Sequence, residues 1–426
     1  MSGNIKEYIK YIARGISPLY DNDGIVVLNQ KCIRNQKISL EESRIHNIHK
    51  KSVSEDKILQ NFDVLINSTG VGTLGRVAQV KNIKDKITVD SHITIVRPNL
   101  EKINGEFFGY CIKVQEDFIE TLGTGATGQT ELSRDAILDN VVIPHYSKEN
   151  QRKIAKVLSN YDDLIENNNK RIKILEEMAQ KIYKEWFVDF NYPGHETATF
   201  KDTELGKIPS DWRYTAISDV LACSIGGGWG NEIKSGEYTE SAYVIRGTDI
   251  PNCRNGNIQN CPLRYHTQSN IKSRLLQEND IIFEVSGGSK GQPVGRSLLL
   301  NKYLFKQFSD NVICASFCKL LRVDSKCASP EYVYLHLLNI YKNGEIEKYQ
   351  TQSTGIINFK FTVFLEKEQI LIPNNNILHL FNTQIIPLFD KISLLGYQNS
   401  ILKQTRDLLL PRLMSGEIDV ENLEIA

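Results

Sequence analysis

Thr124-Gly-Ala-Thr-Gly-Gln-Thr130 begins an order of features that the chain repeats once. An apolar run ending at Val142-Ile-Pro144 follows it, and then a long charged helical pattern. The second copy begins at Ser353-Thr-Gly-Ile-Ile-Asn358, continues with Gln369-Ile-Leu-Ile-Pro373 and ends in another long helical pattern. Corresponding points lie about 230 residues apart, far longer than the periods of solenoids and propellers. We therefore predict two similar domains, each followed by a long helix.

The parts upstream of these stretches also correspond, although more loosely. Ile25–Arg34 parallels Tyr243–Ile250, each an apolar strand that runs into a polar loop, and Leu59–Ile66 parallels Leu276–Phe283. Glycine and proline punctuation and short alternating runs predict α+β domains with many short strands and few helices. The helices expected inside the two domains span Phe107–Leu122 and Pro330–Lys342.

The two long helices carry apolar residues in alternating steps of four and three, which is heptad spacing. A single apolar stripe in water has nothing to bury against, so we predict that the two helices form a coiled coil with each other. The expected core positions are Leu158, Ile165, Asn168, Ile172, Leu175, Ile182, Leu388, Ile392, Leu395, Asn399, Leu402 and Leu409.

Each stripe contains one asparagine near its middle, Asn168 and Asn399. An asparagine in the core fixes the register of a helix pair at a cost in stability, whereas one at a solvated edge does not. The pattern leaves both readings open.

Pro387 is expected to kink the second helix near its start, and Pro411 to end it. A helix of about 35 residues spans roughly 50 Å, so a rigid pair between two domains would act as a ruler.

Composition limits the class of protein without naming its function. The apolar and charged fractions are ordinary for a globular chain, and no secretory signal or run of eighteen apolar residues is present. The eight cysteines show no C-x-x-C spacing, which favours reduced, buried thiols in a cytoplasmic protein over zinc ligands. The net charge of zero does not indicate nucleic-acid binding unless the basic residues gather on one face.

Catalytic motifs are largely absent. Gly70/Gly72/Gly75 and Gly123/Gly125/Gly128 match G-x-G-x-x-G, but neither opens a long helix inside a βαβ unit, as a dinucleotide site requires. There is no phosphate-binding P-loop, no amino-methyltransferase signature and no metal-ligand spacing among the histidines. An E-x-K match at Glu345–Lys348 is better read as a solvated charge cluster, so no catalytic or metal residue is assigned.

Two loops rich in glycine and hydroxyl residues, Ser68–Arg76 and Ser286–Arg296, each end in an arginine. Loops of this kind bring small donors and acceptors close to phosphates and base edges. A hairpin turn that needs glycine for a positive φ would look the same. Because matching loops occur in two domains joined by long helices, we favour binding, with Arg76 and Arg296 beside DNA.

The chain resembles the specificity subunit of type I restriction–modification systems over nearly its whole length. The most specific matches are Lys184-Glu-Trp-Phe-Val-Asp-Phe-Asn-Tyr-Pro-Gly194, Leu205-Gly-Lys-Ile-Pro-Ser-Asp-Trp212 and Leu408-Leu-Leu-Pro-Arg-Leu-Met-Ser-Gly-Glu-Ile418. Thr124–Leu132 is similar to the family's junction between a target-recognition domain and the helix that follows it.

The resemblance implies a non-catalytic subunit in which each α+β domain reads one half of a split DNA sequence. The helices would run antiparallel, set the spacer and dock two methyltransferase subunits, and restriction/translocase subunits would complete the complex on double-stranded DNA. S-adenosylmethionine, ATP and magnesium would bind in those partner subunits, and this chain would bind no cofactor. It would have no contact with a membrane.

The expected parts are 1–147 (first target-recognition domain), 148–190 (first helix), 191–208 (connector), 209–373 (second target-recognition domain) and 374–426 (second helix and C-terminal tail). The expected DNA-binding residues are Lys31, Arg34, Ser68, Thr69, Thr73, Arg76, Thr124, Thr127, Gln129, Arg246, Arg254, Ser286, Ser289, Lys290, Arg296, Ser353, Thr354 and Asn358.

One departure from the family pattern concerns the start of the chain. The second half opens with Trp212–Val220, about thirty residues before Tyr243, and the first half has no tryptophan counterpart. We therefore expect the first domain to lack the usual opening segment.

Two other functions stay open: a fused restriction or methylation enzyme, which the missing motifs disfavour, and a coiled-coil scaffold whose paired domains bind protein or another ligand.

Overall fold

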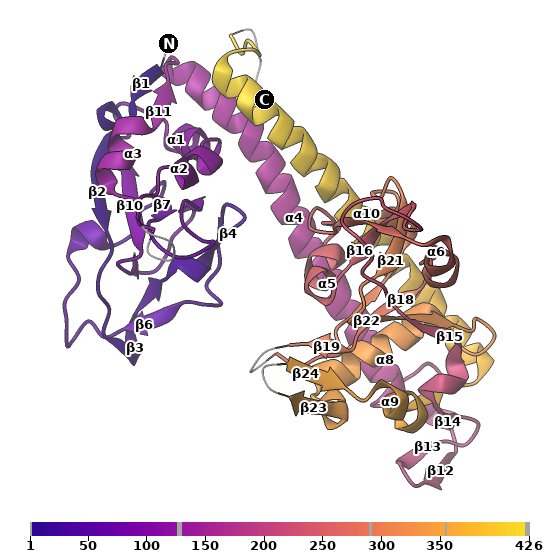
Figure 1. The fold of residues 1–426 in the computed structure, drawn as a ribbon. Helices are drawn as coiled ribbons and strands as arrows, with labels where there is room; N and C mark the ends of the chain where they lie inside the picture. Colours follow the sequence, from indigo (N-terminus) through magenta and orange to yellow (C-terminus); the bar gives the residue numbers. More distant parts are fainter. Residues whose placement is uncertain (1, 126–129, 289–291, 354–355, 422–426) are drawn as a thin grey trace. The chain divides into compact units, whose positions relative to one another are not determined.

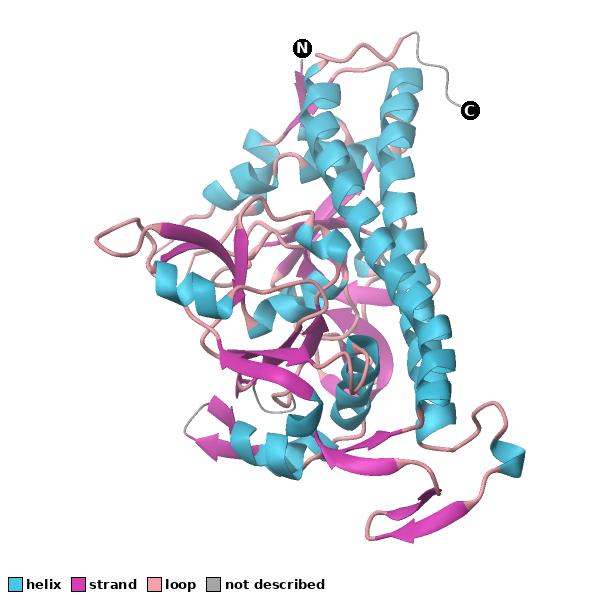
Figure 2. Ribbon diagram, turned by 90° about the vertical axis from the view of Figure 1, so that its right-hand side faces the viewer, coloured by secondary structure: helices cyan, strands magenta, loops and turns pink. Residues whose placement is uncertain are grey.

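The computed structural model describes residues 2–125, 130–288, 292–353 and 356–421. The chain forms two compact units. Unit 1 comprises Met1–Asp163 with Gln404–Ala426, and unit 2 comprises Leu164–Lys403. Two long helices, α4 (Lys148–Phe187) and α10 (Asn375–Ser415), each contribute to both units. In Figure 2 they are the two longest cyan helices, and the magenta strands are much shorter.

Unit 1 is an α+β domain built on short strands (Figure 1). Its strands are β1 (Ser2–Asn4), β2 (Ile9–Arg14), β3 (Tyr20–Leu28), β4 (Ile33–Arg34), β5 (Lys37–Ile38), β6 (Arg44–His46), β7 (Val64–Asn67), β8 (Val77–Gln79), β9 (Ile87–Val89), β10 (Ile93–Pro98) and β11 (Val142–Pro144). Its shorter helices are α1 (Gly105–Lys113), α2 (Glu116–Thr121) and α3 (Arg134–Asn140).

Unit 2 is an α+β domain of the same kind. Its strands are β12 (Phe200–Thr203), β13 (Gly206–Pro209), β14 (Arg213–Ala216), β15 (Leu221–Gly226), β16 (Glu240–Ile245), β17 (Leu263–His266), β18 (Ile281–Glu284), β19 (Ser286–Gly287), β20 (Ser297–Leu299), β21 (Asn311–Cys314), β22 (Cys318–Val323), β23 (Gln350–Ser353), β24 (Ile356–Phe359) and β25 (Gln369–Ile372). Its shorter helices are α5 (Ile250–Arg254), α6 (Gln268–Arg274), α7 (Lys302–Phe305), α8 (Pro330–Lys342) and α9 (Phe361–Lys367).

The two units share their sheet topology, which confirms the repeat predicted from the sequence. A four-stranded antiparallel sheet has the order β2-β10-β7-β8 in unit 1 and β15-β22-β18-β20 in unit 2. A three-stranded sheet has the order β6-β3-β9 in one and β17-β16-β21 in the other, and its β3–β9 and β16–β21 pairs are parallel. The likeness therefore extends to strand order and direction.

A buried arginine–aspartate pair recurs at the same place in the two four-stranded sheets. Arg97 of β10 donates two hydrogen bonds to Asp63 at 2.8 Å, and Arg322 of β22 donates two to Asp280 at 2.7 Å. The aspartates are 0% and 1% exposed. A buried carboxylate requires such compensation, because an unpaired charge in the interior is costly. The sequence analysis did not identify these pairs, although both aspartates follow the matched Leu-Gln motif.

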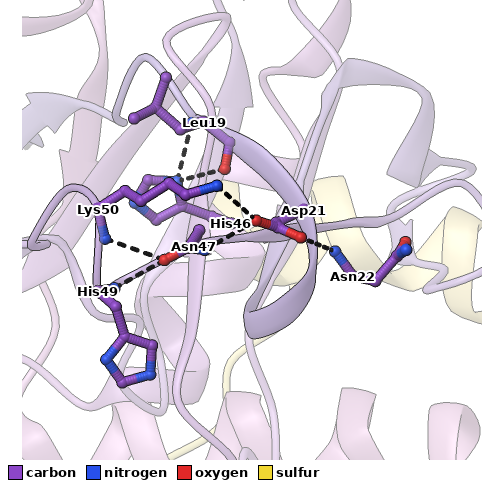
Figure 3. A network of polar contacts seen from close by, with 7 residues as sticks. All are labelled: Leu19, Asp21, Asn22, His46, Asn47, His49 and Lys50. Atoms are coloured by element: carbon purple, nitrogen blue, oxygen red, sulfur yellow. Dashed lines mark hydrogen bonds and ion pairs between the residues drawn. The ribbon is translucent and has the colours of Figure 1, made fainter.

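Hydrogen bonds among polar groups connect residues of the segment from Leu19 to Lys50 in unit 1 (Figure 3). The Leu19 N–H group donates to Nδ1 of the buried His46 at 2.9 Å. Asn47 and Lys50 donate to the Asp21 carboxylate at 2.8 and 3.1 Å. The hydrogen bond from Asn47, followed by those from the Asn22 backbone and Lys50, lowers the pKa of Asp21 to about 2.

In unit 2, α4 and α10 run antiparallel along their heptad stripes. Asn168 Nδ2 donates to Asn399 Oδ1 at 3.0 Å, and Asn399 Nδ2 donates to Asn169 Oδ1 at 2.9 Å. Ile172, four residues after Asn168 in α4, lies in an apolar cluster with Leu395, four residues before Asn399 in α10. The contacts therefore advance in opposite directions along the two helices. Asn399 is 0% exposed, so the two asparagines occupy the core and not a solvated edge.

In unit 1 the start of α4 meets the end of α10. Ile154 and Leu158 share a core with Leu413. Arg406 of α10 donates to Asp162 at 2.6 Å, and the Tyr110 hydroxyl donates to the same carboxylate at 2.6 Å. Of the expected coiled-coil positions, the buried ones are Leu158, Ile165, Asn168, Ile172, Ile392, Leu395 and Asn399, and the half-buried ones are Leu175, Ile182, Leu388, Leu402 and Leu409.

Two predictions about helix ends were wrong. α10 continues through Pro411 to Ser415 and ends at Gly416, whose φ is +79°. Proline loses one hydrogen bond, but the buried side chain of Leu413 holds the last turn, and a left-handed glycine is a common helix terminator. The helix expected over 107–122 is two helices, α1 and α2, separated at Val114–Gln115.

The expectation that the first half lacks an opening segment was also wrong. β1 pairs with β11 as β14 pairs with β25, and each opening strand leads through a short 3₁₀ turn into the edge of the four-stranded sheet. The backbone hydrogen bond from Ile5 N to Val141 O corresponds to that from Ile217 N to Glu368 O. What differs is Trp212, which is buried among aromatic residues at the end of α4 in unit 2.

Candidate nucleic-acid interface

Each unit gathers several loops at one edge of its four-stranded sheet. The first glycine loop (68–76) joins β7 to β8, and the second glycine loop (285–296) joins β18 to β20. Because neighbouring strands are antiparallel, the turns 90–92 and 315–317, which lead into β10 and β22, emerge at the same edges. Short loops at the end of a rigid sheet are a common arrangement for binding residues.

The two units build this edge with matching backbone hydrogen bonds. Asn67 N donates to Arg76 O in unit 1, and Glu284 N donates to Arg296 O in unit 2, each at 2.9 Å. The turns match as well, because Ser68 N donates to His92 O at 2.8 Å and Val285 N donates to Phe317 O at 2.9 Å. These contacts align the glycine loops residue by residue at both ends.

In unit 1 the first glycine loop meets the threonine-rich stretch near Thr124. Glu131 forms backbone bridges with both Thr69 and Thr124, and Leu132 N donates to Ser68 O at 2.8 Å. The Ser68 side chain is buried and hydrogen-bonded to Thr94, which gives it a structural role. Thr69 and Thr73 are half-buried and Thr124 is exposed.

In unit 2 the second glycine loop meets the corresponding stretch through β19, β24 and β23. Ser286 Oγ donates to Asn358 Oδ1 at 2.9 Å. Ser353 is the last residue of β23. Thr127, Gln129, Ser289, Lys290 and Thr354, also expected at DNA, lie outside the described residues.

The polar loops after β3 and β16 border the same edges. In unit 1, Asn67 Nδ2 donates to the backbone oxygen of Gln30 at 3.0 Å, beside the exposed Lys31 and Arg34. In unit 2, Arg246 is bound to Asp249 at 2.8 Å, and Arg254 donates to Ser297 O at 2.6 Å. The basic residues of this loop are therefore held within the fold in unit 2 but exposed in unit 1.

The two arginines that close the glycine loops have different environments. Arg296 donates to the buried Glu284 through Nε and Nη2, with its side chain only 12% exposed, and this partner raises the pKa of Arg296. In unit 1 the residue matching Glu284 is the neutral Asn67, and Arg76 donates to Gly72 O at 2.6 Å. Among the residues that the structure describes, no carboxylate forms an ion pair with Arg76, whereas Arg296 is paired with Glu284.

The sequence analysis missed the residues at the tips of the two turns. His92 is exposed, and its Nδ1 lies 2.6 Å from Thr69 Oγ1. Phe317, its equivalent in unit 2, is 62% exposed. The shared serine in Asp90-Ser-His92 and Ala315-Ser-Phe317 was the available signal, because each triplet directly precedes a strand of the repeat.

The described residues contain no group of three or more side chains that could hold a metal ion. Their cysteines are all free thiols. None of the helices within the described ranges is long and apolar enough to cross a membrane.

Comparisons with known proteins agree with this architecture. The model for the type I restriction modification DNA specificity domain matches residues 7–177. The chain is 29% identical over 389 residues to the type I restriction enzyme MjaIX specificity subunit of Methanocaldococcus jannaschii, covering 88% of this chain and 83% of that protein. It is 23% identical over 482 residues to the HindI specificity subunit of Haemophilus influenzae, covering 97% and 99%. The crystal structure of a type I restriction–modification S subunit from M. genitalium has the same fold, with a TM-score of 0.52 and 14% identity over 97% of this chain and 96% of that one.

Proposed function

We infer from these likenesses that the chain is a specificity subunit of a type I restriction–modification system, and we propose that each of its two α+β domains reads one half of a bipartite DNA sequence. Such a subunit is not an enzyme, and it recognises DNA for its complex. The duplicated sheet edge carries the proposal, because the same loops stand at the same place in both units. The loop side chains differ between the units, so the two halves of the sequence would differ as well.

We further propose that α4 and α10 set the spacer between the half-sequences. The antiparallel pairing of the helices, with an asparagine contact fixing one register, supports a rod of defined length. The helix α4 has 40 residues, which corresponds to about 60 Å. A rod of that length is long enough to separate two sites on a duplex by several base pairs.

The outer faces of these helices would dock two methyltransferase subunits. Leu164, Ile174 and Met178 are 51%, 55% and 45% exposed on α4, and they lie outside the buried stripe. Ile174 and Met178 are one helical turn apart, and exposed apolar residues that adjoin on a surface are typical of a protein interface. Restriction/translocase subunits would join this assembly, and S-adenosylmethionine, ATP and magnesium would bind in the partners, in the cytoplasm.

The test is to express this chain with its methyltransferase subunits and to map methylated bases across a genome. We expect one split sequence with a fixed gap, methylated on both halves. A short duplex carrying that sequence should compete better than the same duplex with either half scrambled. Methylation without sequence preference, or a target without a gap, would contradict the proposal and favour a coiled-coil scaffold.

A further inference from the structure

In each four-stranded sheet, the turn before one of the two inner strands presents one exposed side chain. These turns are 90–92 before β10 and 315–317 before β22. His92 stands at the tip in unit 1 and Phe317 in unit 2, and the matching hydrogen bonds to Ser68 and Val285 show that the positions are equivalent. Both residues directly precede the strand that lies between two neighbours in the four-stranded order, β10 or β22. The position is therefore central at the sheet edge.

The surroundings of Phe317 place it between two other loops of unit 2. On one side Val285, the first residue of the second glycine loop, donates to the Phe317 backbone. On the other side Gly227 lies against the carbonyl oxygens of Cys314 and Ala315, where an added Cβ would come within 2.2 Å. Only glycine allows this close approach, so the loop after β15 is held against the turn.

Phe317 does not serve the core of its unit. Its side chain is 62% exposed, whereas the neighbouring Ala315 and Cys318 are 5% and 0% exposed. Exposing a phenylalanine forgoes the stabilisation that burial of its apolar surface would give. A side chain of this kind at a binding edge is available for an apolar contact with a ligand.

His92 offers polar chemistry at the same point in unit 1. Its Nδ1 lies 2.6 Å from Thr69 Oγ1, which fixes the ring, and no hydrogen bond of Nε2 is found within the described ranges. Thr69 belongs to the first glycine loop, so the ring is anchored to the loop that was expected at DNA. An imidazole nitrogen can hydrogen-bond a base edge, whereas a phenyl ring has no hydrogen-bond donor or acceptor.

We propose that this position reads a base in each domain, with Phe317 making an apolar contact to a base in the second half-site and His92 a polar contact in the first. The inference rests on the proposed function and adds the residues that give the two domains different base preferences. A thymine methyl group is the base feature that an apolar side chain recognises in the major groove. DNA is favoured over a protein partner because His92 is bonded to the glycine loop of its own domain.

The test uses the complete complex of this chain with its methyltransferase subunits. Phe317→Ala should weaken binding to the split sequence about tenfold, the usual effect of one lost base contact. Because no phosphate contact is removed, the slope of affinity against salt should stay unchanged. Methylation mapping should show relaxed choice at one base pair of the second half, and His92→Phe should alter one base pair of the first half only.

The controls separate this inference from the function on which it rests. Phe200→Ala removes another exposed phenylalanine, on the β12 strand outside the sheet edge, and should change neither affinity nor sequence. If the wild-type complex reads no split sequence, the proposed function fails. If it reads one, and Phe317→Ala and His92→Phe both keep affinity and sequence, only this inference fails. Loss of methyltransferase subunits from the purified Phe317→Ala complex, with sequence choice unchanged, would assign the ring to a protein interface and also overturn it.

Discussion

At the scale of single residues, the two domains solve the same electrostatic problem in different ways. Both place an arginine at the end of the glycine loop, but only unit 2 places a carboxylate, Glu284, opposite it. Glu284 is 2% exposed, so its charge depends on Arg296. Equivalent positions therefore need not have equivalent functions, and the sequence repeat alone assigned both arginines to DNA.

We predict that alanine substitutions at Arg76 and Arg296 have opposite signatures. Arg76→Ala should leave the thermal unfolding temperature unchanged and lower DNA affinity by about 1–3 kcal/mol. Arg296→Ala should destabilise unit 2 by about 3–5 kcal/mol, because it leaves the buried Glu284 charge unpaired. Calorimetry and a DNA-binding titration measure the two effects, and the double variant Glu284→Ala with Arg296→Ala should recover stability. Equal destabilisation by both single substitutions would refute the distinction.

A second residue-scale prediction concerns His336 of α8. Burial lowers the pKa of His336 to about 4, although the nearby Glu368 carboxylate opposes the shift. An unfolded histidine has a pKa of about 6.5, so protons favour the unfolded chain. Stability is therefore complete above about pH 6.5, and up to about 3 kcal/mol of it should be lost as the pH falls towards 4.

The control for this prediction is His336→Asn, which keeps an acceptor for the Tyr183 hydroxyl, 3.1 Å from Nδ1, but cannot be protonated. Denaturant unfolding at several pH values should show a shallower acid loss in the variant than in the wild-type chain. Superimposable pH profiles would mean that His336 does not contribute to acid unfolding.

At the scale of elements, local signals predicted the structure well where they were strong. The helix α8 spans Pro330–Lys342 as expected, because Ser329 caps its first turn and proline is favoured at the first helical position. The prediction failed at Pro411, where packing of the helix end into the core of unit 1 outweighed the local preference. The candidate site was predicted through its glycine loops, but the tip residues and the Glu284 partner depend on tertiary contacts with no local pattern.

The asparagine contact between α4 and α10 gives an element-scale prediction. Asn399→Leu should destabilise the helix pair by about 1–3 kcal/mol, because it leaves the buried Asn168 amide without its acceptor. Replacing both asparagines by leucine should restore or raise stability, since polar core residues are retained for register at a cost in stability. Thermal unfolding of the two variants decides the matter, and a double variant less stable than Asn399→Leu would contradict this account.

The spacer role of the helices makes a further prediction at this scale. Inserting seven residues after Lys170 and seven after Tyr397 adds one heptad to each helix and keeps the apolar stripes aligned. Both insertions lie between the Asn168–Asn399 contact and the cluster that contains Ile172. Each helix becomes about 10 Å longer, which is about three base pairs at ~3.4 Å each. Methylation mapping should find both half-sequences unchanged and a gap longer by two or three base pairs. A folded variant with the old gap would show that the helices do not set the spacing.

At the scale of the whole molecule, the repeat predicted two domains but not the composition of unit 1. That unit contains residues from both ends of the chain, because Leu413, Met414 and Val420 lie in the same core as Ile154 and Leu158. Contacts between segments about 260 residues apart leave no local trace in the sequence. An exchange of the first 147 residues alone would therefore leave the C-terminal turn of α10 facing a foreign core.

We predict that the two domains read their half-sequences independently. Replacing residues 1–163 together with 404–421 by the matching segments of a relative with a different target should change one half of the methylated sequence only. Each unit has its own four-stranded sheet and its own loops at the sheet edge, so the base contacts of one do not depend on the side chains of the other. Replacing residues 1–147 alone should give the same new half-sequence but a lower unfolding temperature, because core contacts with Leu413 and Met414 are lost. A change in both halves would mean that the sheet edges are not the elements that read DNA.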